Sequence, residues 1–138
     1  MYTYDVQYAD FNTYQVKEMG IIDVSGAISA FRLFPFKEEY EKARLLPEGT
    51  APTISFRSQA DEVTLAVWLY EPEVYEVFLK LSDAMVTVRT SDEQFIIEVI
   101  KSFFTGSRED LFKQLKSNPT AVTKQSLRRR LKSIFSKS

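Results

Sequence analysis

Apolar and polar residues alternate along the middle of the chain, and this period of two predicts β-strands. The turn Glu71-Pro72-Glu73 separates two of them, because proline cannot donate a hydrogen bond within a central ladder. Short turns between consecutive strands imply an antiparallel meander. We expect its strands at residues 53–58, 62–70, 74–81 and 84–90. Another alternating run at residues 2–8 predicts a fifth strand, which residues 14–17 extend or pair with.

Before the meander, the apolar spacing changes to the 3.6-residue period of a helix. The positions that carry this period are Val24, Ala27, Ile28, Phe31 and Phe34. Asp23 or Ser25 is a suitable N-cap, because either side chain accepts a hydrogen bond from the first turn. The competing interpretation is a hairpin that turns at Ser25-Gly26.

A second helix is predicted over residues 36–45. Pro35 fits the first helical position, where its missing N–H breaks no helical hydrogen bond. Within this helix, Glu38 and Lys42 have the i,i+4 spacing that predicts an ion pair. Pro47 then stops the helix.

The helical period returns after the meander. Thr90 and Glu93 match a capping box, in which a hydroxyl precedes a Glu by three residues. The apolar stripe that follows consists of Ile96, Val99, Ile100, Phe103 and Phe104. Gly106 is placed to end this helix, and Ser107 is placed to cap another that ends near residues 118–119. Strands in the middle and helices after them indicate an α+β domain, a sheet of about four to five strands with helices on one face.

The basic residues gather in the tail. Residues 121–138 contain six Lys or Arg and no acid, whereas residues 1–120 carry a net charge of −7. We therefore divide the chain into a single α+β domain at 1–120 and a basic amphipathic tail at 121–138, with a helix over about 124–135. Its apolar stripe contains Leu127, Leu131, Ile134 and Phe135. Its basic arc contains Arg128, Arg129, Arg130 and Lys132.

Two roles are open for this tail. We expect the apolar stripe to dock on the acidic body, which supplies both burial and opposite charge. The alternative is that the basic arc contacts an anionic membrane or a nucleic acid, which would make the protein a peripheral adaptor.

The composition argues against an enzyme. The chain has no Cys and no His, which excludes disulfides, Cys/His zinc sites, haem ligation and a Ser-His-Asp triad. Chemistry would have to use carboxylates, Lys, Tyr or carboxylate-bound Mg²⁺. The sequence has neither the spacing of an EF-hand loop nor a glycine-rich phosphate loop. We expect a non-enzymatic protein with no cofactor, no metal and no small-molecule substrate.

Acidic and aromatic residues supply the candidate contacts with a protein partner. The acids surround two predicted turns and are Asp61, Glu62, Glu71, Glu73 and Glu76. An acidic surface accelerates association with a basic partner. The aromatic candidates are Trp68, Tyr70 and Tyr75. Trp68 and Tyr70 lie on the strand face opposite Leu65 and Val67, and we expect a helix to cover that face. The alternative is an exposed aromatic platform.

Several stretches together suggest a family. Phe34-Pro35-Phe36 precedes a helix, the segment 51–56 and the Trp68 strand follow, and the segment 90–106 ends with Phe103-Phe104. This arrangement resembles small bacterial immunity proteins of polymorphic-toxin and contact-dependent inhibition systems. The resemblance covers residues 25–116 and leaves out the basic tail. It implies an inhibitor that binds a cognate toxin and occludes its active site without chemistry of its own. Because no secretory signal is visible at the N-terminus, we expect a cytoplasmic protein.

Overall fold

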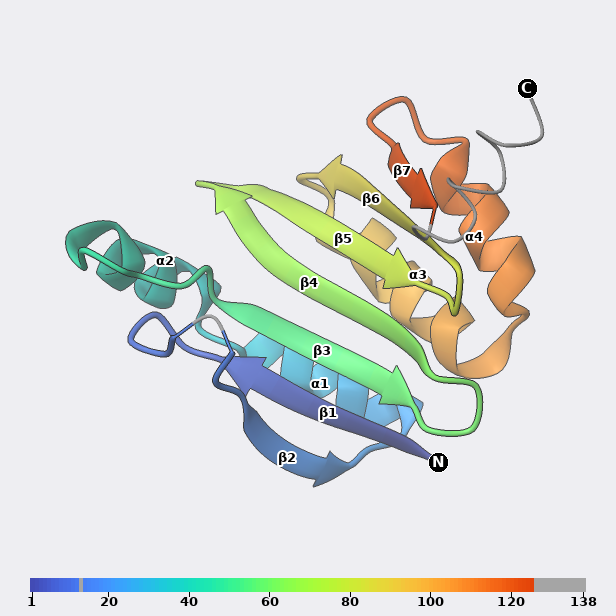
Figure 1. The fold of residues 1–138 in the computed structure, drawn as a ribbon, viewed down its shortest axis with the longest axis horizontal. Coiled ribbons are helices and arrows are strands. Elements are labelled where there is room, and N and C mark those ends of the chain that lie inside the picture. The colour runs from blue at the N-terminus through green and yellow to red at the C-terminus, as the bar shows by residue number, and fades with distance from the viewer. Residues whose placement is uncertain (13, 126–138) are drawn as a thin grey trace, which may run out of the picture.

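The computed structural model describes residues 1–12 and 14–125 as one antiparallel sheet with helices packed on it (Figure 1). The strand order is β2-β1-β3-β4-β5-β6-β7. The strands are β1 Tyr2–Gln7, β2 Lys17–Ile21, β3 Thr53–Ser58, β4 Val63–Glu71, β5 Val74–Lys80, β6 Ala84–Thr90 and β7 Val122–Gln125. The helices are α1 Val24–Leu33, α2 Phe36–Leu45, α3 Glu93–Thr105 and α4 Arg108–Lys116. The α+β prediction is confirmed, and so is the meander β3–β6.

The sheet is wider than the sequence pattern indicates. β2 lies at residues 17–21, beyond the predicted 14–17, and all five of its residues are exposed, so no burial alternation marks it. β7 contains Lys124 and Gln125, which we predicted as the start of the tail helix. That prediction is wrong because β7 pairs with β6, with Thr87 opposite Val122 and Ala84 opposite Gln125. The remainder of the predicted tail helix lies outside the described residues.

The first two helices form where the apolar period predicts them. The Asp23 side chain accepts a hydrogen bond from the Gly26 N–H at 2.7 Å, so α1 is capped and the hairpin alternative is wrong. Pro35 precedes α2 as its N-cap rather than occupying the first helical position. Lys42 pairs with Glu39 at 3.0 Å instead of the predicted Glu38. The Glu39 carboxylate is buried and accepts from the Ala9 N–H at 2.9 Å, which positions it for Lys42.

The predicted capping box at the start of α3 is wrong. Asp92 is the N-cap, and its side chain accepts from the N–H groups of Gln94 and Phe95. Thr90 ends β6, and its hydroxyl accepts from the Asp92 N–H at 3.0 Å. The predicted helix end at Gly106 and the predicted cap at Ser107 are confirmed.

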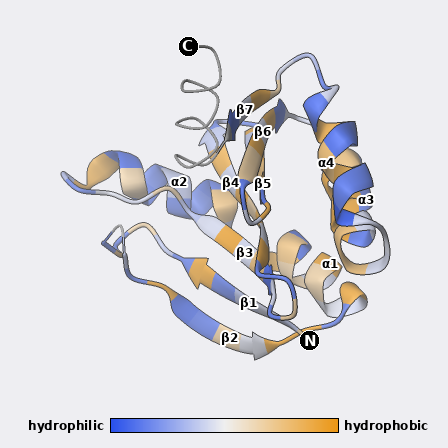
Figure 2. Cartoon of the chain, turned by 45° about the vertical axis from the view of Figure 1, so that its right-hand side comes forward, coloured by the Kyte–Doolittle hydropathy of each residue, from blue (hydrophilic) through white to orange (hydrophobic). Residues whose placement is uncertain are grey.

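The hydrophobic core lies between the sheet and the helices. Alternate strand residues such as Phe56, Leu65, Val77 and Val88 are fully buried there. In Figure 2, α1, α3 and α4 lie together on one side of the sheet. α2 projects past the end of the sheet, near the start of β3 (Figure 1). None of the helices in the described part of the chain is both long enough and apolar enough to span a membrane.

Candidate protein-binding face of the sheet

The side of the sheet that faces away from α1 and α3 carries no helix within residues 1–12 and 14–125 (Figure 1). The expected helix over Trp68 is therefore not found in the described part of the chain. Strand register arranges the side chains of β3–β7 on this side in three cross-strand rows. Row one holds Thr53, Trp68, Glu76 and Arg89; row two holds Ser55, Ala66, Phe78, Thr87 and Val122; row three holds Arg57, Thr64, Lys80, Met85 and Lys124. These three rows, with Tyr70, are the open face.

Row one is joined by polar contacts. The Trp68 indole Nε1–H donates to Glu76 Oε1 at 2.8 Å, and Arg89 Nε donates to Glu76 Oε2 at 3.2 Å. The Arg89 guanidinium lies 3.8 Å from the centre of the Tyr70 ring, within the range of a cation–π interaction. The Glu76 side chain is only 15% exposed, so its charge is largely enclosed by the two groups that bind it. One carboxylate thus fixes an indole and a guanidinium side by side.

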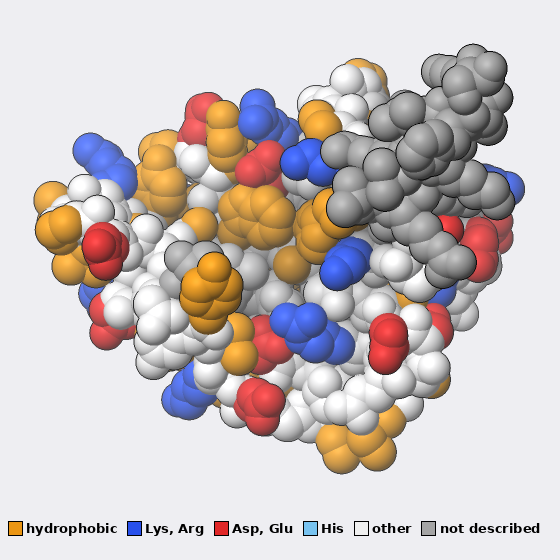
Figure 3. Space-filling view, viewed as in Figure 1, with side chains coloured by type: hydrophobic (Ala, Val, Ile, Leu, Met, Phe, Trp, Pro, Cys, Tyr) orange, Lys and Arg blue, Asp and Glu red, His pale blue; other side chains and the backbone are white. Residues whose placement is uncertain are grey.

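Row two is uncharged, and row three is cationic. Phe78 of row two packs near Trp68, with ring centres 6.0 Å apart. In row three, Arg57 bonds to Asp5 of β1 at 2.8 Å. Lys80 and Lys124 are exposed and form no ion pair within the described residues. Figure 3 looks onto this face and shows hydrophobic side chains near its middle with both basic and acidic side chains around them.

The structure brings together three of the predicted partner-binding residues, Trp68, Tyr70 and Glu76. It separates Tyr75 from them, so grouping Tyr75 with Trp68 is wrong. Tyr75 points to the helix side, is 6% exposed and donates its hydroxyl to Glu93 Oε1 at 3.1 Å. The reason is the side-chain alternation of β5, which sends neighbouring residues to opposite faces.

The remaining predicted acids lie at opposite ends of β4. Asp61 and Glu62 lie in the β3–β4 turn, whereas Glu71 and Glu73 lie at the β4–β5 turn. At about 3.3 Å per strand residue the two turns are roughly 26 Å apart, so these acids do not form one continuous patch. Glu76 is a mid-strand residue of β5 rather than a turn residue.

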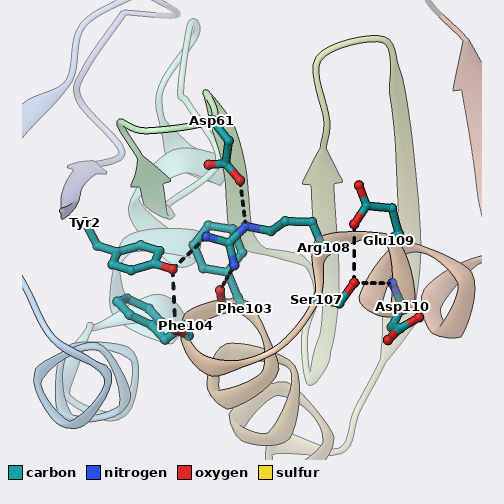
Figure 4. Close-up of polar contacts among 8 residues, drawn as sticks. All are labelled: Tyr2, Asp61, Phe103, Phe104, Ser107, Arg108, Glu109 and Asp110. Carbon is teal, nitrogen blue, oxygen red and sulfur yellow. Dashed lines mark hydrogen bonds and ion pairs between the residues drawn. The ribbon is translucent and has the colours of Figure 1, made fainter.

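Asp61 has a structural partner, shown in Figure 4. Arg108 Nε lies 3.2 Å from Asp61 Oδ2, and Arg108 also donates to the Tyr2 hydroxyl at 2.7 Å and to the Phe103 carbonyl. A hydrogen bond from Ser58, together with the Arg108 charge, lowers the pKa of Asp61. Asp61 thus ties the β3–β4 turn to the junction of α3 and α4.

Sequence reasoning missed Phe78, Lys80 and Arg89. Alternation on the 74–81 strand could have found the first two, since they share a side with Glu76. Arg89 required the β5–β6 register, which places it opposite Glu76. The predicted anion-binding residues Arg128, Arg129, Arg130 and Lys132 lie outside the described residues.

The comparisons with known proteins supply no relative. No family model, no curated protein and no solved structure matches the chain. Within the part of the chain that the structure describes, no three acidic side chains converge in a group that could hold a metal ion.

Proposed function

We propose that this protein binds another protein through the open face, as an immunity protein that neutralises a bacterial toxin by direct contact. The observation that carries the proposal is the joined set Trp68, Glu76, Arg89 and Tyr70 on a sheet face with no described helix over it. Trp, Tyr and Arg are the residues enriched among those that dominate binding energy in protein interfaces.

The contacts within this set favour tight binding. Glu76 holds Trp68 and Arg89 in fixed positions, so little side-chain entropy remains to be lost when a partner arrives. The Glu76 carboxylate already has hydrogen-bonded partners, which reduces the penalty of covering its charge. The same side chains therefore form a rigid surface before any partner binds.

The resemblance over residues 25–116 is the support for a toxin as the partner. Inhibitors of that kind act by covering a toxin's active site, and a rigid aromatic surface suits that task. The protein itself then needs no catalytic group.

The test first asks whether a toxic domain is encoded beside this gene, and that domain is then used as the partner. We expect co-expression to restore growth and calorimetry to show a direct complex. Trp68→Ala should weaken that complex by at least about 2 kcal/mol, roughly thirtyfold, and abolish protection. Tyr14→Ala is the matched control, because Tyr14 is an aromatic residue that is 94% exposed, lies between β1 and β2 and belongs to none of the three rows.

Two results would contradict the proposal. Absence of a complex with the neighbouring toxic domain would rule out the immunity role. A folded Trp68→Ala variant, checked by circular dichroism, that binds and protects like the unaltered protein would move the interface off the open face.

A further inference from the structure

We infer that the protein segment recognised by the open face is an acidic amphipathic helix, with its apolar stripe on row two and its carboxylates beside the cations of row three. The inference deepens the proposed function and rests on it, because it assumes that the open face binds protein. It also differs from the sequence-based expectation of a basic partner.

The charge of the open face is opposite to that of the body. Arg57, Lys80, Arg89 and Lys124 lie on it, against Glu76 and the neighbouring Asp5 of β1, which pair with Arg89 and Arg57. Residues 1–120 as a whole carry a net charge of −7, whereas the open face has an excess of basic over acidic side chains. Complementary potential is the usual basis of orientation in protein complexes, and it calls for carboxylates on the partner.

Two of these cations have no ion pair, and a third, Arg89, has donors that are not yet used. Arg57 is occupied by Asp5 at 2.8 Å, and Arg89 by Glu76 at 3.2 Å. Lys80 and Lys124 are exposed and have no ion pair within residues 1–12 and 14–125. Arg89 donates to Glu76 through Nε, and no hydrogen bond from its two terminal amino groups is found within that part of the chain. Those groups present a planar fork that fits a carboxylate.

The spacing of the rows fits a helix. Lys80 and Lys124 flank Met85 in row three, two strand spacings apart, which is about 10 Å. Carboxylates at positions i and i+7 of a helix are also about 10 Å apart, at 1.5 Å per residue. Row two lies two residues along the strands from row three, about 7 Å away. A helix about 10 Å wide can therefore lay an apolar stripe on Phe78, Thr87 and Val122 while its acidic flank reaches the lysines.

A single-stranded nucleic acid is the competing ligand, because aromatic and basic side chains also bind bases and phosphates. The carboxylates of Glu76 and Asp5 argue against it. They already pair with Arg89 and Arg57, so the cations without an ion pair, Lys80 and Lys124, do not form the continuous basic groove that a phosphate backbone follows. The observations therefore favour a protein ligand.

Trp68 reports directly on this surface. It is the only tryptophan in the chain, so its fluorescence and its single indole N–H signal in NMR come from row one. The probes are three synthetic helical peptides of about 18 residues with the same Leu stripe, flanked by Glu, by Gln or by Lys. A single-stranded oligouridine is the fourth probe. The full-length protein is titrated with each.

We expect the Glu-flanked peptide to shift the Trp68 signals and to bind at least tenfold more tightly than the Lys-flanked peptide. Lys80→Glu with Lys124→Glu should reverse this preference. The control pair Lys113→Glu with Lys116→Glu makes the same change of charge on α4 and should leave the preference intact. Equal or reversed preference in the unaltered protein, no response of Trp68 to any peptide, or tighter binding of the oligouridine would overturn the inference.

These outcomes are separable from those of the proposed function. If the toxin contacts Trp68 through a basic surface, the proposed function stands and the inference of an acidic helix fails. If the protein clearly prefers the acidic peptide but does not bind the neighbouring toxic domain, the inference of an acidic helix stands and the immunity role fails.

Discussion

Tyr75 lies where β5 meets the ends of α1 and α2. Its ring centre is 5.9 Å from that of Phe31 and 5.3 Å from that of Phe36, and its hydroxyl bonds to Glu93. Burial, with Glu93 as the second cause, raises the pKa of Tyr75 to about 12. The sequence places Tyr75 on the apolar side of its strand with Val77, but the spacing alone does not identify Glu93 as its partner. That contact depends on where α3 begins, and the sequence signal put the cap on Thr90 instead of Asp92.

The raised pKa of Tyr75 makes the stability of the protein sensitive to alkaline pH. In the unfolded chain the hydroxyl ionises near its ordinary value of 10.0, whereas the folded protein retains the proton to about 12. This stabilising contribution is complete below pH 10 and declines as pH rises toward 12. Between pH 9 and 11 the free energy of unfolding should fall about 1 kcal/mol more in the unaltered protein than in Tyr75→Phe. Urea unfolding at each pH measures this free energy, and the variant Tyr14→Phe, at an exposed tyrosine, is the control. Parallel pH profiles for the protein and Tyr75→Phe would contradict the assignment.

The strands of the meander were predictable because each carries its own alternation of β-branched and apolar residues, as in Thr53–Ser58. β2 and β7 were not predictable from the sequence, because their strand conformation depends on pairing with strands far away in the chain. β2 is exposed along its length, and β7 gains its strand conformation by lying beside β6. The helix caps Asp23 and Ser107 were predictable from local chemistry, whereas the arrangement of the open face required the register of five strands. Local signals thus define the elements, and their pairing defines the candidate site.

Two of the turns that join these strands are strained. Glu62 has a φ of 56° and Glu73 a φ of 68°, in the left-handed region that favours glycine. Replacing either by Gly relieves the steric strain but raises the entropy of the unfolded chain, for a net stabilisation of about 1 kcal/mol. Thermal unfolding of Glu62→Gly and Glu73→Gly measures the gain. Glu48→Gly, in another exposed turn and without a positive φ, should give no gain. A lower melting temperature for both turn variants would argue against strain at these sites.

At the scale of the whole molecule, the division between domain and tail lies further along the chain than residue 120. β7 at Val122–Gln125 completes the sheet and belongs to the domain. Thr120 also contacts the sheet, since its hydroxyl accepts from the Arg89 N–H at 2.8 Å. Charge composition alone put the boundary too early, because the four residues of β7 include only one of the tail's basic residues, Lys124.

This boundary leads to a truncation experiment. Removing residues 122–138 strips β6 of its neighbour and opens its hydrogen-bonding edge to other chains. We expect a melting temperature several degrees lower and concentration-dependent association, measured by calorimetry and light scattering. Removing residues 126–138 retains β7 and serves as the matched control, so the difference between the two variants reports on the strand. Equal melting temperatures for the two would mean that β7 adds nothing to the sheet.

The open face and the core share the same strands, and this sharing has an evolutionary consequence. Along β4, Leu65, Val67 and Leu69 are buried beneath the helices, while Thr64 and Trp68 belong to the open face and are partly exposed. Selection can therefore alter every second residue of β3–β6 to suit a new partner while the intervening residues keep the fold unchanged. Residues that contact a partner and residues that form the core alternate along one strand. A lineage of such proteins can therefore change partners without first acquiring compensating core substitutions.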